Sequence, residues 1–287
     1  MTIPIQTLVP ATLMLTILSC WCVPKRYTGG LIFATLAAGL WCDVITAVAL
    51  PSLALLAISG WGAVNGKGWL RPLATLLFIL TSIILACHWL PGFHNILIWN
   101  HETVKADSVP FTLFYNVDKP WIGLVILLVC TPLLKSSDQW RQAIWRSLLP
   151  IAVMLPVVFG VGMLIGFVRW QPAWTELGGW FLLNNLVFTA VAEEAFFRGF
   201  IQESLSEHLS EQGSGFSYGK EFALLITAIL FGLAHYAGGP VYMMLAALAG
   251  LFYGWSYMRS GSIEMAILTH WFLNAGHFIF FSYPLAV

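Results

Sequence analysis

Charged residues are scarce in this chain of 287 residues. Asp, Glu, Lys and Arg together make up 9% of it, whereas soluble globular domains carry about 25%. Hydrophobic residues reach 59%, and the mean hydropathy is +0.82. This composition excludes a soluble globular domain and predicts a protein that crosses a lipid bilayer several times.

Several chemical signals are also missing. The net charge is zero and no run of five or more basic residues occurs, so we expect no nucleic acid or acidic polymer as a partner. The amino-terminal segment lacks a basic start, which favours a first transmembrane helix over a cleaved signal peptide. No Cys-x-x-Cys pair occurs, so we expect no zinc knuckle or redox dithiol from Cys20, Cys22, Cys42, Cys87 and Cys130.

Apolar segments of about 20 residues, the length that one crossing needs, predict an all-α fold: a polytopic transmembrane helix bundle of about eight spans. These spans are expected near residues 3–23, 29–59, 72–91, 121–134, 146–168, 178–205, 222–238 with 240–258, and 263–281. The second is too long for one straight crossing, so it is a tilted helix, a kinked helix or two short helices. The short fourth span is expected to extend at one end.

Polar segments between the spans carry two further expectations. The largest, residues 92–120, is expected to be a surface loop or an interfacial segment. The most basic short loop contains Lys135, Arg141 and Arg146. The positive-inside rule predicts that this loop is cytoplasmic.

Small and amide side chains within the spans indicate helix packing. Ala246, Gly250 and Gly254 repeat at a spacing of four residues, which is suited to close contact between helices. Asn184 and Asn185 are expected to bond to a neighbouring helix.

A cluster of charges interrupts the sixth predicted span. Glu193, Glu194 and Arg198 lie at a depth where each charge costs about 2.5 to 3.5 kcal/mol on insertion scales, so we interpret the cluster as a functional site. Residues four apart share a helical face, so Glu194 and Arg198 can pair. Glu193 is rotated about 100° away and is predicted to lack a local partner, which leaves it available for chemistry.

Polar groups on two later spans reach similar depths. Glu193 lies 13 residues before the polar loop at 206–221, and His235 lies 14 residues after it, so both are roughly 20 Å from that face. His270 and Asn274 share one helical face and lie roughly 12 to 18 Å from the same face. We therefore expect the three helices to bring these groups together.

A carboxylate, two imidazoles and an amide are the groups that amide hydrolysis by water requires. A general base takes a proton from water, a second group returns a proton to the leaving amine, and hydrogen-bond donors hold the oxyanion. The predicted cluster could supply each of these roles.

Three motifs on successive spans resemble the signature of the CAAX protease and bacteriocin-processing family, the glutamic intramembrane endopeptidases. They are Glu193-Glu194-x-x-x-Arg198, Phe231-x-x-x-His235 and His270-x-x-x-Asn274. The resemblance covers about residues 178–281. All three motifs in this order are far more specific than any one of them.

The resemblance implies proteolysis without a metal or another cofactor. Glu193 and His235 would activate a water molecule, and His270 and Asn274 would stabilise the oxyanion. The substrate would be a membrane-anchored, lipidated or tailed protein or peptide in the lipid bilayer. The expected location is the cytoplasmic membrane of a bacterium, and no oligomeric state is assigned.

The resemblance also implies supporting roles and a division of the chain. Glu194 and Arg198 would orient the site, and Phe231 would support it. Residues 171–287 would form the catalytic helix core, and residues 1–170 would be further transmembrane helices of unassigned role. No internal repeat of fixed period occurs, so both parts are expected to form one integrated membrane domain.

Three alternatives remain open. Glu193, Glu194, His235 and His270 would make an acceptable zinc set, so a zinc-dependent version of the same protease is one. A proton-coupled transporter could use the same buried carboxylates, although we find none of the inverted repeats typical of that class. A non-enzymatic membrane protein that only binds tails is the third.

Other intramembrane proteases fit the sequence less well. A site-2 type needs His-Glu-x-x-His, but His101-Glu102 is followed at the required position by Lys105. An aspartyl type needs paired intramembrane aspartates, whereas Asp43 is interpreted as standing alone at depth. A rhomboid-type serine is expected in a helix, but Gly213-Ser-Gly falls in a polar loop.

Overall fold

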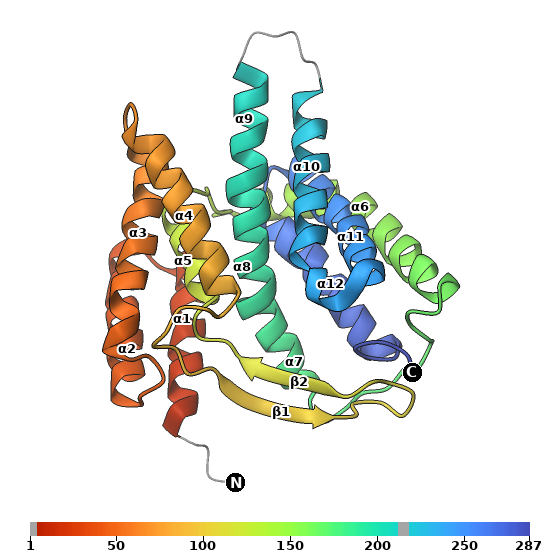
Figure 1. The fold of residues 1–287 in the computed structure, drawn as a ribbon. Helices are drawn as coiled ribbons and strands as arrows, with labels where there is room; N and C mark the ends of the chain where they lie inside the picture. The colour runs from red at the N-terminus through yellow and green to blue at the C-terminus, as the bar shows by residue number, and fades with distance from the viewer. Residues whose placement is uncertain (1–4, 212–217) are drawn as a thin grey trace. The chain divides into compact units, whose positions relative to one another are not determined.

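The computed structural model describes residues 5–211 and 218–287. This part of the chain is mostly helical and includes one two-stranded sheet (Figure 1). It divides into two compact units that alternate along the sequence. Unit 1 comprises Met1–Trp99, Leu113–Pro132 and Val187–Ala195, and unit 2 comprises Asn100–Thr112, Leu133–Leu186 and Phe196–Val287.

Two helical hairpins and one short buried helix make up most of unit 1. Its helices are α1 (Leu8–Cys22), α2 (Lys25–Trp41), α3 (Leu50–Asn65), α4 (Leu70–Ala86), α5 (Pro120–Val129) and α8 (Val191–Glu194). Helix α1 packs on α2 and α3 packs on α4, while α5 contacts α1, α3 and α8. The expected span at 29–59 is therefore two helices. Asp43 lies in the turn between them with φ of +54°.

Helix α5 is shorter than expected. It ends at Val129 instead of extending, and ten residues span only about 15 Å of a hydrocarbon core about 30 Å thick. Residues Pro120 to Leu127 are all buried. At Gly123, a Cβ atom would lie 3.0 Å from the Cα of Ala192, so glycine lets α5 approach α8 closely. Helix α5 is thus a buried core helix of unit 1.

Long helices around α11 make up unit 2. The helices assigned to it are α6 (Ser137–Leu164), α7 (Gly178–Asn184), α9 (Glu203–Glu211), α10 (Gly219–Ala234), α11 (Gly239–Ser260) and α12 (Ile263–Phe280). Helix α11 packs against α6, α10 and α12. Their shared core consists of Met154, Val158, Phe231, Ala246, Ala249, Tyr253 and Leu273.

Two π-helical segments interrupt the helical stretch from α7 to α9. They cover Asn185–Ala190 and Ala195–Gln202, and α8 with Glu193 and Glu194 lies between them. Such wide turns are rare in proteins, and those that occur are often found at functional sites. The predicted glutamate pair therefore lies in an irregular part of an otherwise regular helix.

The interval 92–120 is not a plain loop. It forms a hairpin of β1 (Ile96–Glu102) and β2 (Phe111–Tyr115), which run in opposite directions (Figure 1). The aromatic and β-branched residues Phe-Thr-Leu-Phe-Tyr of β2 favour a strand, which the prediction of a loop or interfacial segment did not include. The hairpin is an exception to the all-α prediction.

The polar loop expected at 206–221 is also shorter than predicted. Helix α9 continues to Glu211 and α10 begins at Gly219. Residues 212–217, which include the Gly213-Ser-Gly sequence, lie outside the described residues. Both helices extend further towards the loop than predicted. Glu193 and His235 are therefore more residues away from the loop than the 13 and 14 counted from the sequence.

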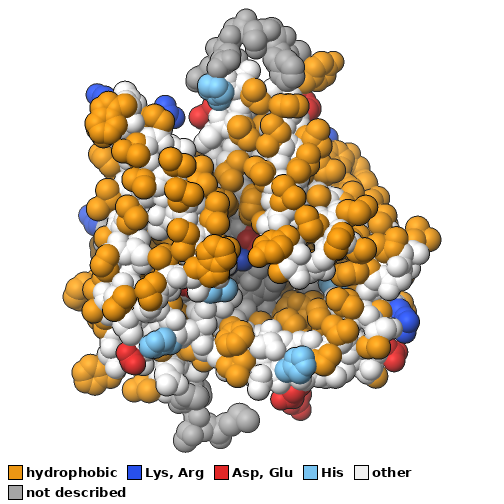
Figure 2. Space-filling view, viewed as in Figure 1, with side chains coloured by type: hydrophobic (Ala, Val, Ile, Leu, Met, Phe, Trp, Pro, Cys, Tyr) orange, Lys and Arg blue, Asp and Glu red, His pale blue; other side chains and the backbone are white. Residues whose placement is uncertain are grey.

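Apolar side chains cover the outward faces of several helices, as expected of an integral membrane protein. Figure 2 shows them over α3 and α4 and over α10 and α11. On α4 and α10 the exposed ones recur every three or four residues: Leu73, Leu76, Leu80 and Ile83, then Phe222, Leu225, Ile229 and Leu233. Lipid tails suit such a face.

Four helical segments among the described residues are long and apolar enough to cross a membrane. They are Ile5–Cys22, Ala47–Asn65, Ser137–Leu164 and Tyr236–Ser260. Helices α4 and α5 are apolar but shorter. The predicted count of about eight spans is not confirmed.

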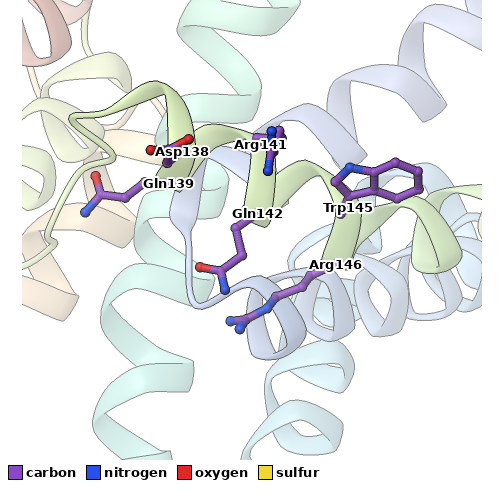
Figure 3. Close-up of a pocket in the computed structure, with 6 residues that line it drawn as sticks. All are labelled: Asp138, Gln139, Arg141, Gln142, Trp145 and Arg146. Atoms are coloured by element: carbon purple, nitrogen blue, oxygen red, sulfur yellow. The ribbon is translucent and has the colours of Figure 1, made fainter.

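The basic segment before the fifth predicted span is largely helical. Arg141 and Arg146 lie on the first turns of α6 instead of in a loop. At 28 residues, α6 is about 42 Å long, so one end extends beyond a hydrocarbon core about 30 Å thick. A surface cavity of about 750 Å³ is lined by residues from Asp138 to Arg146 (Figure 3). It contains none of the predicted catalytic residues.

Lys105 closes the carboxyl end of α12. It lies between β1 and β2, is 5% exposed, and its ammonium donates to the carbonyl oxygens of Gln171, Ile279 and Phe281 at 2.9, 3.1 and 2.6 Å. The last carbonyls of a helix lack intrahelical partners and favour a cation. Burial lowers the pKa of Lys105 to about 8, so the ammonium is still mainly charged at neutral pH.

We predict that Lys105→Met destabilises the protein. The substitution retains an apolar stem but removes one donor from each of three carbonyl oxygens, of which that of Ile279 keeps the N–H of Ala173. Leaving buried acceptors unpaired costs about 1 to 3 kcal/mol. Thermal unfolding of the purified protein in detergent measures the loss as a lower Tm. Lys67→Met, at an exposed position, is the control, and equal Tm values for the two variants would contradict this role for Lys105.

Candidate active site

The predicted site residues belong to two units. Glu193 and Glu194 lie on α8 in unit 1. The others lie in unit 2: Arg198 on the second π-helical segment, Phe231 and His235 on and just after α10, and His270 and Asn274 on α12. The two parts of the site are therefore described separately. The meeting of Glu193 with His235, and the pairing of Glu194 with Arg198, stay predictions.

Phe231 lies at the centre of the unit 2 part. Its ring centroid is 4.6 Å from that of His235 and 5.8 Å from that of His270. The guanidinium carbon of Arg198 lies 4.6 Å from the same ring centroid. Three of the other predicted residues are thus gathered around one buried aromatic ring.

His235 lies at the carboxyl end of α10 rather than within it. Its Nδ1 is 2.7 Å from the carbonyl oxygen of Phe231. A carbonyl can only accept a hydrogen bond, so Nδ1 carries a proton. In the neutral ring, Nε2 is then the nitrogen that carries a lone pair. The side chain of His235 is half-buried. This tautomer suits an imidazole that accepts a proton from water.

His270 and Asn274 lie one turn apart on α12, and each has a fixed neighbour. His270 is 4% exposed, and its ring stacks on Tyr253 with centroids 4.5 Å apart and planes 9° apart. The Nδ2 of Asn274 donates to the Oδ1 of Asn185 at 3.2 Å. The expected bond from Asn185 to another helix is therefore confirmed. The sequence analysis did not predict that Asn274 is the partner of Asn185, or that Tyr253 stacks on His270.

Arg198 is fully buried and is anchored to α11. Its Nη2 donates to the carbonyl oxygen of Gly250 at 2.9 Å. One turn later, the Nε2 of Gln202 donates to the carbonyl oxygen of Gly254 at 3.2 Å. The small-residue stripe predicted for helix packing therefore also provides acceptors for side chains of the neighbouring segment.

Glu193 has a distant partner in unit 1. The Nζ of Lys119, the residue before α5, donates to its Oε1, and the two side chains are 20% and 12% exposed. The prediction that Glu193 is left available for chemistry was therefore wrong, because Lys119 binds its carboxylate. Lys119 was not predicted as a site residue. The available signal was a lysine followed by proline at the start of an apolar segment.

The described residues contain no group of three or more His, Cys, Asp or Glu side chains arranged to hold a metal ion. The four residues of the zinc alternative are divided between the two units. Whether the reaction uses zinc stays a prediction.

Comparisons with known proteins assign the segment that holds these residues. Residues 174–276 match the family model described as type II CAAX prenyl endopeptidase Rce1-like. This segment is similar to the Rce1-like family. The match is consistent with the CAAX protease and bacteriocin-processing family, and it supports a hydrolase of the protease class.

The matched segment has defined limits. It covers less than half of the chain, yet it includes every residue predicted for the site, from Glu193 to Asn274. Lys119 lies outside it. Neither the comparison with curated proteins nor that with solved structures gave a significant match.

We predict that Gly250→Ala disturbs Arg198. A Cβ atom at this position would lie 3.1 Å from Nη2 of Arg198 and 3.3 Å from the Cα of Ala228. Overpacking of this kind costs about 1 to 3 kcal/mol, so the Tm falls and proteolytic activity falls with it. Gly160→Ala on α6 is the control, because nothing lies within 4 Å of its Cβ. A Gly250→Ala protein that matches this control would contradict the assigned contact.

Proposed function

We propose that the protein is an intramembrane endopeptidase of the glutamic type. It hydrolyses a peptide bond in a membrane-anchored, lipidated or tailed substrate. The observation that carries this proposal is the Rce1-like match over residues 174–276, which contains three intact polar motifs. Apolar faces on several helices support its location in a lipid bilayer.

The proposed reaction uses water as the nucleophile. Glu193 and His235 take a proton from a water molecule while its oxygen attacks the carbonyl carbon of the substrate. His270 and Asn274 donate hydrogen bonds to the oxyanion of the tetrahedral intermediate. The carbon–nitrogen bond then breaks, and the proton held by the base passes to the leaving amine. The Nδ1 hydrogen bond of His235 supports this role because it leaves Nε2 as the proton acceptor.

Arg198, Glu194 and Phe231 have supporting roles in this proposal. The contacts of Arg198 with Gly250 and with the Phe231 ring hold its guanidinium in one place. From there it would orient Glu194, four residues earlier along the helical stretch. The ring of Phe231 would keep the two imidazoles at a fixed separation.

The proposed setting is the cytoplasmic membrane of a bacterium. Candidate substrates share a cleavable tail close to a membrane anchor, and they include prenylated CAAX tails, bacteriocin leaders and carboxy-terminal sorting tails. Co-expression with such substrates, followed by mass spectrometry of their termini, identifies the one that is cut.

We predict that Glu193→Gln and His235→Ala each abolish cleavage while the protein stays folded. Each change removes a proton acceptor, and general acid–base catalysis contributes about 100- to 10,000-fold to such reactions. The measurement is mass spectrometry of substrate termini, with folding checked by size exclusion in detergent. Cleavage by either folded variant at the wild-type rate would remove that residue from the mechanism.

We predict that chelators leave the activity unchanged. In the proposed mechanism Glu193 acts as the base and no metal takes part. Cleavage assays after dialysis against EDTA or 1,10-phenanthroline test this, together with metal analysis of the purified protein. Loss of activity on chelation, with recovery when zinc is added back, would contradict this prediction and support the zinc-dependent mechanism instead.

A further inference from the structure

We propose that Lys119 is a positioning residue for Glu193. Its ammonium holds the carboxylate ionised and directed, and a hydrogen-bonded network around Asp118 fixes Lys119 in turn. This inference rests on the proposed function, in which Glu193 is the general base. All the residues involved lie in unit 1.

Burial makes the contact between Lys119 and Glu193 consequential. With exposed fractions of 20% and 12%, both side chains are largely shielded from solvent. A carboxylate in such a place is costly unless an opposite charge and hydrogen bonds compensate for its lost hydration. An adjacent cation also favours the ionised form of a carboxylate. Lys119 therefore keeps Glu193 in the form that can accept a proton.

The backbone brings Lys119 to Glu193 through the contact between α5 and α8. Lys119 directly precedes α5, one helical turn before Gly123. Gly123 allows close approach to Ala192, the neighbour of Glu193 on α8. Because residues four apart share a helical face, the same face that meets α8 at Gly123 presents Lys119 to Glu193.

A second set of hydrogen bonds fixes the backbone around Lys119. The Oδ1 of Asp118 accepts from the backbone N–H of Lys119 at 2.8 Å, and its Oδ2 lies 2.6 Å from Nδ1 of His88. The Oδ1 of Asn95 accepts from the backbone N–H of Val117 at 2.8 Å. Asp118 is only 2% exposed, so a buried carboxylate anchors the segment.

The charged groups next to Glu193 in unit 1 include one cation that bonds to it, Lys119. Helix α5, which packs against α8, has no titratable side chain of its own. Lys119 forms an ion pair with Glu193, Glu194 is its neighbour in the sequence, and Asp118 bonds to His88 behind the lysine. Because Lys119 is the cation among them that bonds to Glu193, its removal changes the ionisation of the base directly.

Lys25 provides a matched control at the other end of α5. Its Nζ donates to the carbonyl oxygen of Leu128. Like Lys119, it tethers α5 through an ammonium group, but it contacts a backbone oxygen instead of a predicted catalytic side chain. A purely structural effect of losing a lysine at α5 is therefore measured by Lys25→Met.

The test is the pH dependence of kcat and kcat/KM for wild type, Lys119→Met, Lys119→Arg and Lys25→Met. The probe is a synthetic peptide that covers the cleavage site found in the co-expression experiment. For Lys119→Met we expect kcat to fall by about tenfold to a hundredfold, as for a misplaced catalytic group. We also expect the acidic limb of the profile, where kcat falls as the pH is lowered, to move to higher pH, because Glu193 has lost its cation.

Each outcome decides the proposal. Lys119→Arg restores the position of the acidic limb, and Lys25→Met keeps the wild-type profile. An unmoved limb in folded Lys119→Met overturns the proposal, and a rise in KM alone assigns Lys119 to substrate binding instead. If Lys119→Met does not fold, Lys119→Gln carries the same test. When no wild-type cleavage is found, the proposed function fails; wild-type cleavage with an unmoved limb refutes only the role of Lys119.

Discussion

The fully buried guanidinium of Arg198 constrains the arrangement of unit 2. A charge in that position is stable only where hydrogen-bond acceptors and polarisable groups surround it. The carbonyl oxygen of Gly250 and the rings of Phe231 and Tyr253 supply part of this environment. Because those groups come from α10 and α11, the arginine requires both helices to lie close to its own segment. The rings that surround Arg198 also contact His270, so one buried cation and two rings locate the histidine.

The lysines follow a similar principle. Lys25 donates to Leu128, Lys105 to three carbonyls near the end of α12, and Lys119 to Glu193. In a chain with few charges, these three have specific acceptors. Each of these three ammonium groups is therefore directed at a defined oxygen atom or group of oxygen atoms. Each of these lysines joins segments that are distant in the sequence.

Much of the fold could be predicted from the sequence because hydropathy and helical spacing are local properties. The ends of α12, the split between α2 and α3 as one alternative, and the packing use of Gly250 and Gly254 all follow from such patterns. The match over residues 174–276 also agrees with the family resemblance. For the helix ends and the packing residues, the signal lies within about 20 neighbouring residues, the scale of one membrane crossing.

The features that were missed depend on contacts between distant segments. Lys119 and Glu193 are 74 positions apart, and no periodicity links them. The shortness of α5 could not be read from its hydropathy, because a buried core helix and a membrane span have the same composition. The bond between Asn274 and Asn185 likewise joins residues 89 positions apart. Predicting such pairs requires the tertiary fold.

The π-helical segments on either side of α8 have a consequence for how this site can change over time. A π-bulge corresponds to one extra residue that is accommodated in a wide turn of a helix. Loss of a single codon within Ala195–Gln202 can therefore be taken up by tightening the wide turn into a regular α-helical turn, which leaves the residues on either side facing the same neighbours. Single-residue deletions should be tolerated better in this stretch than in the regular helices, where each deletion rotates everything beyond it by about 100° around the axis.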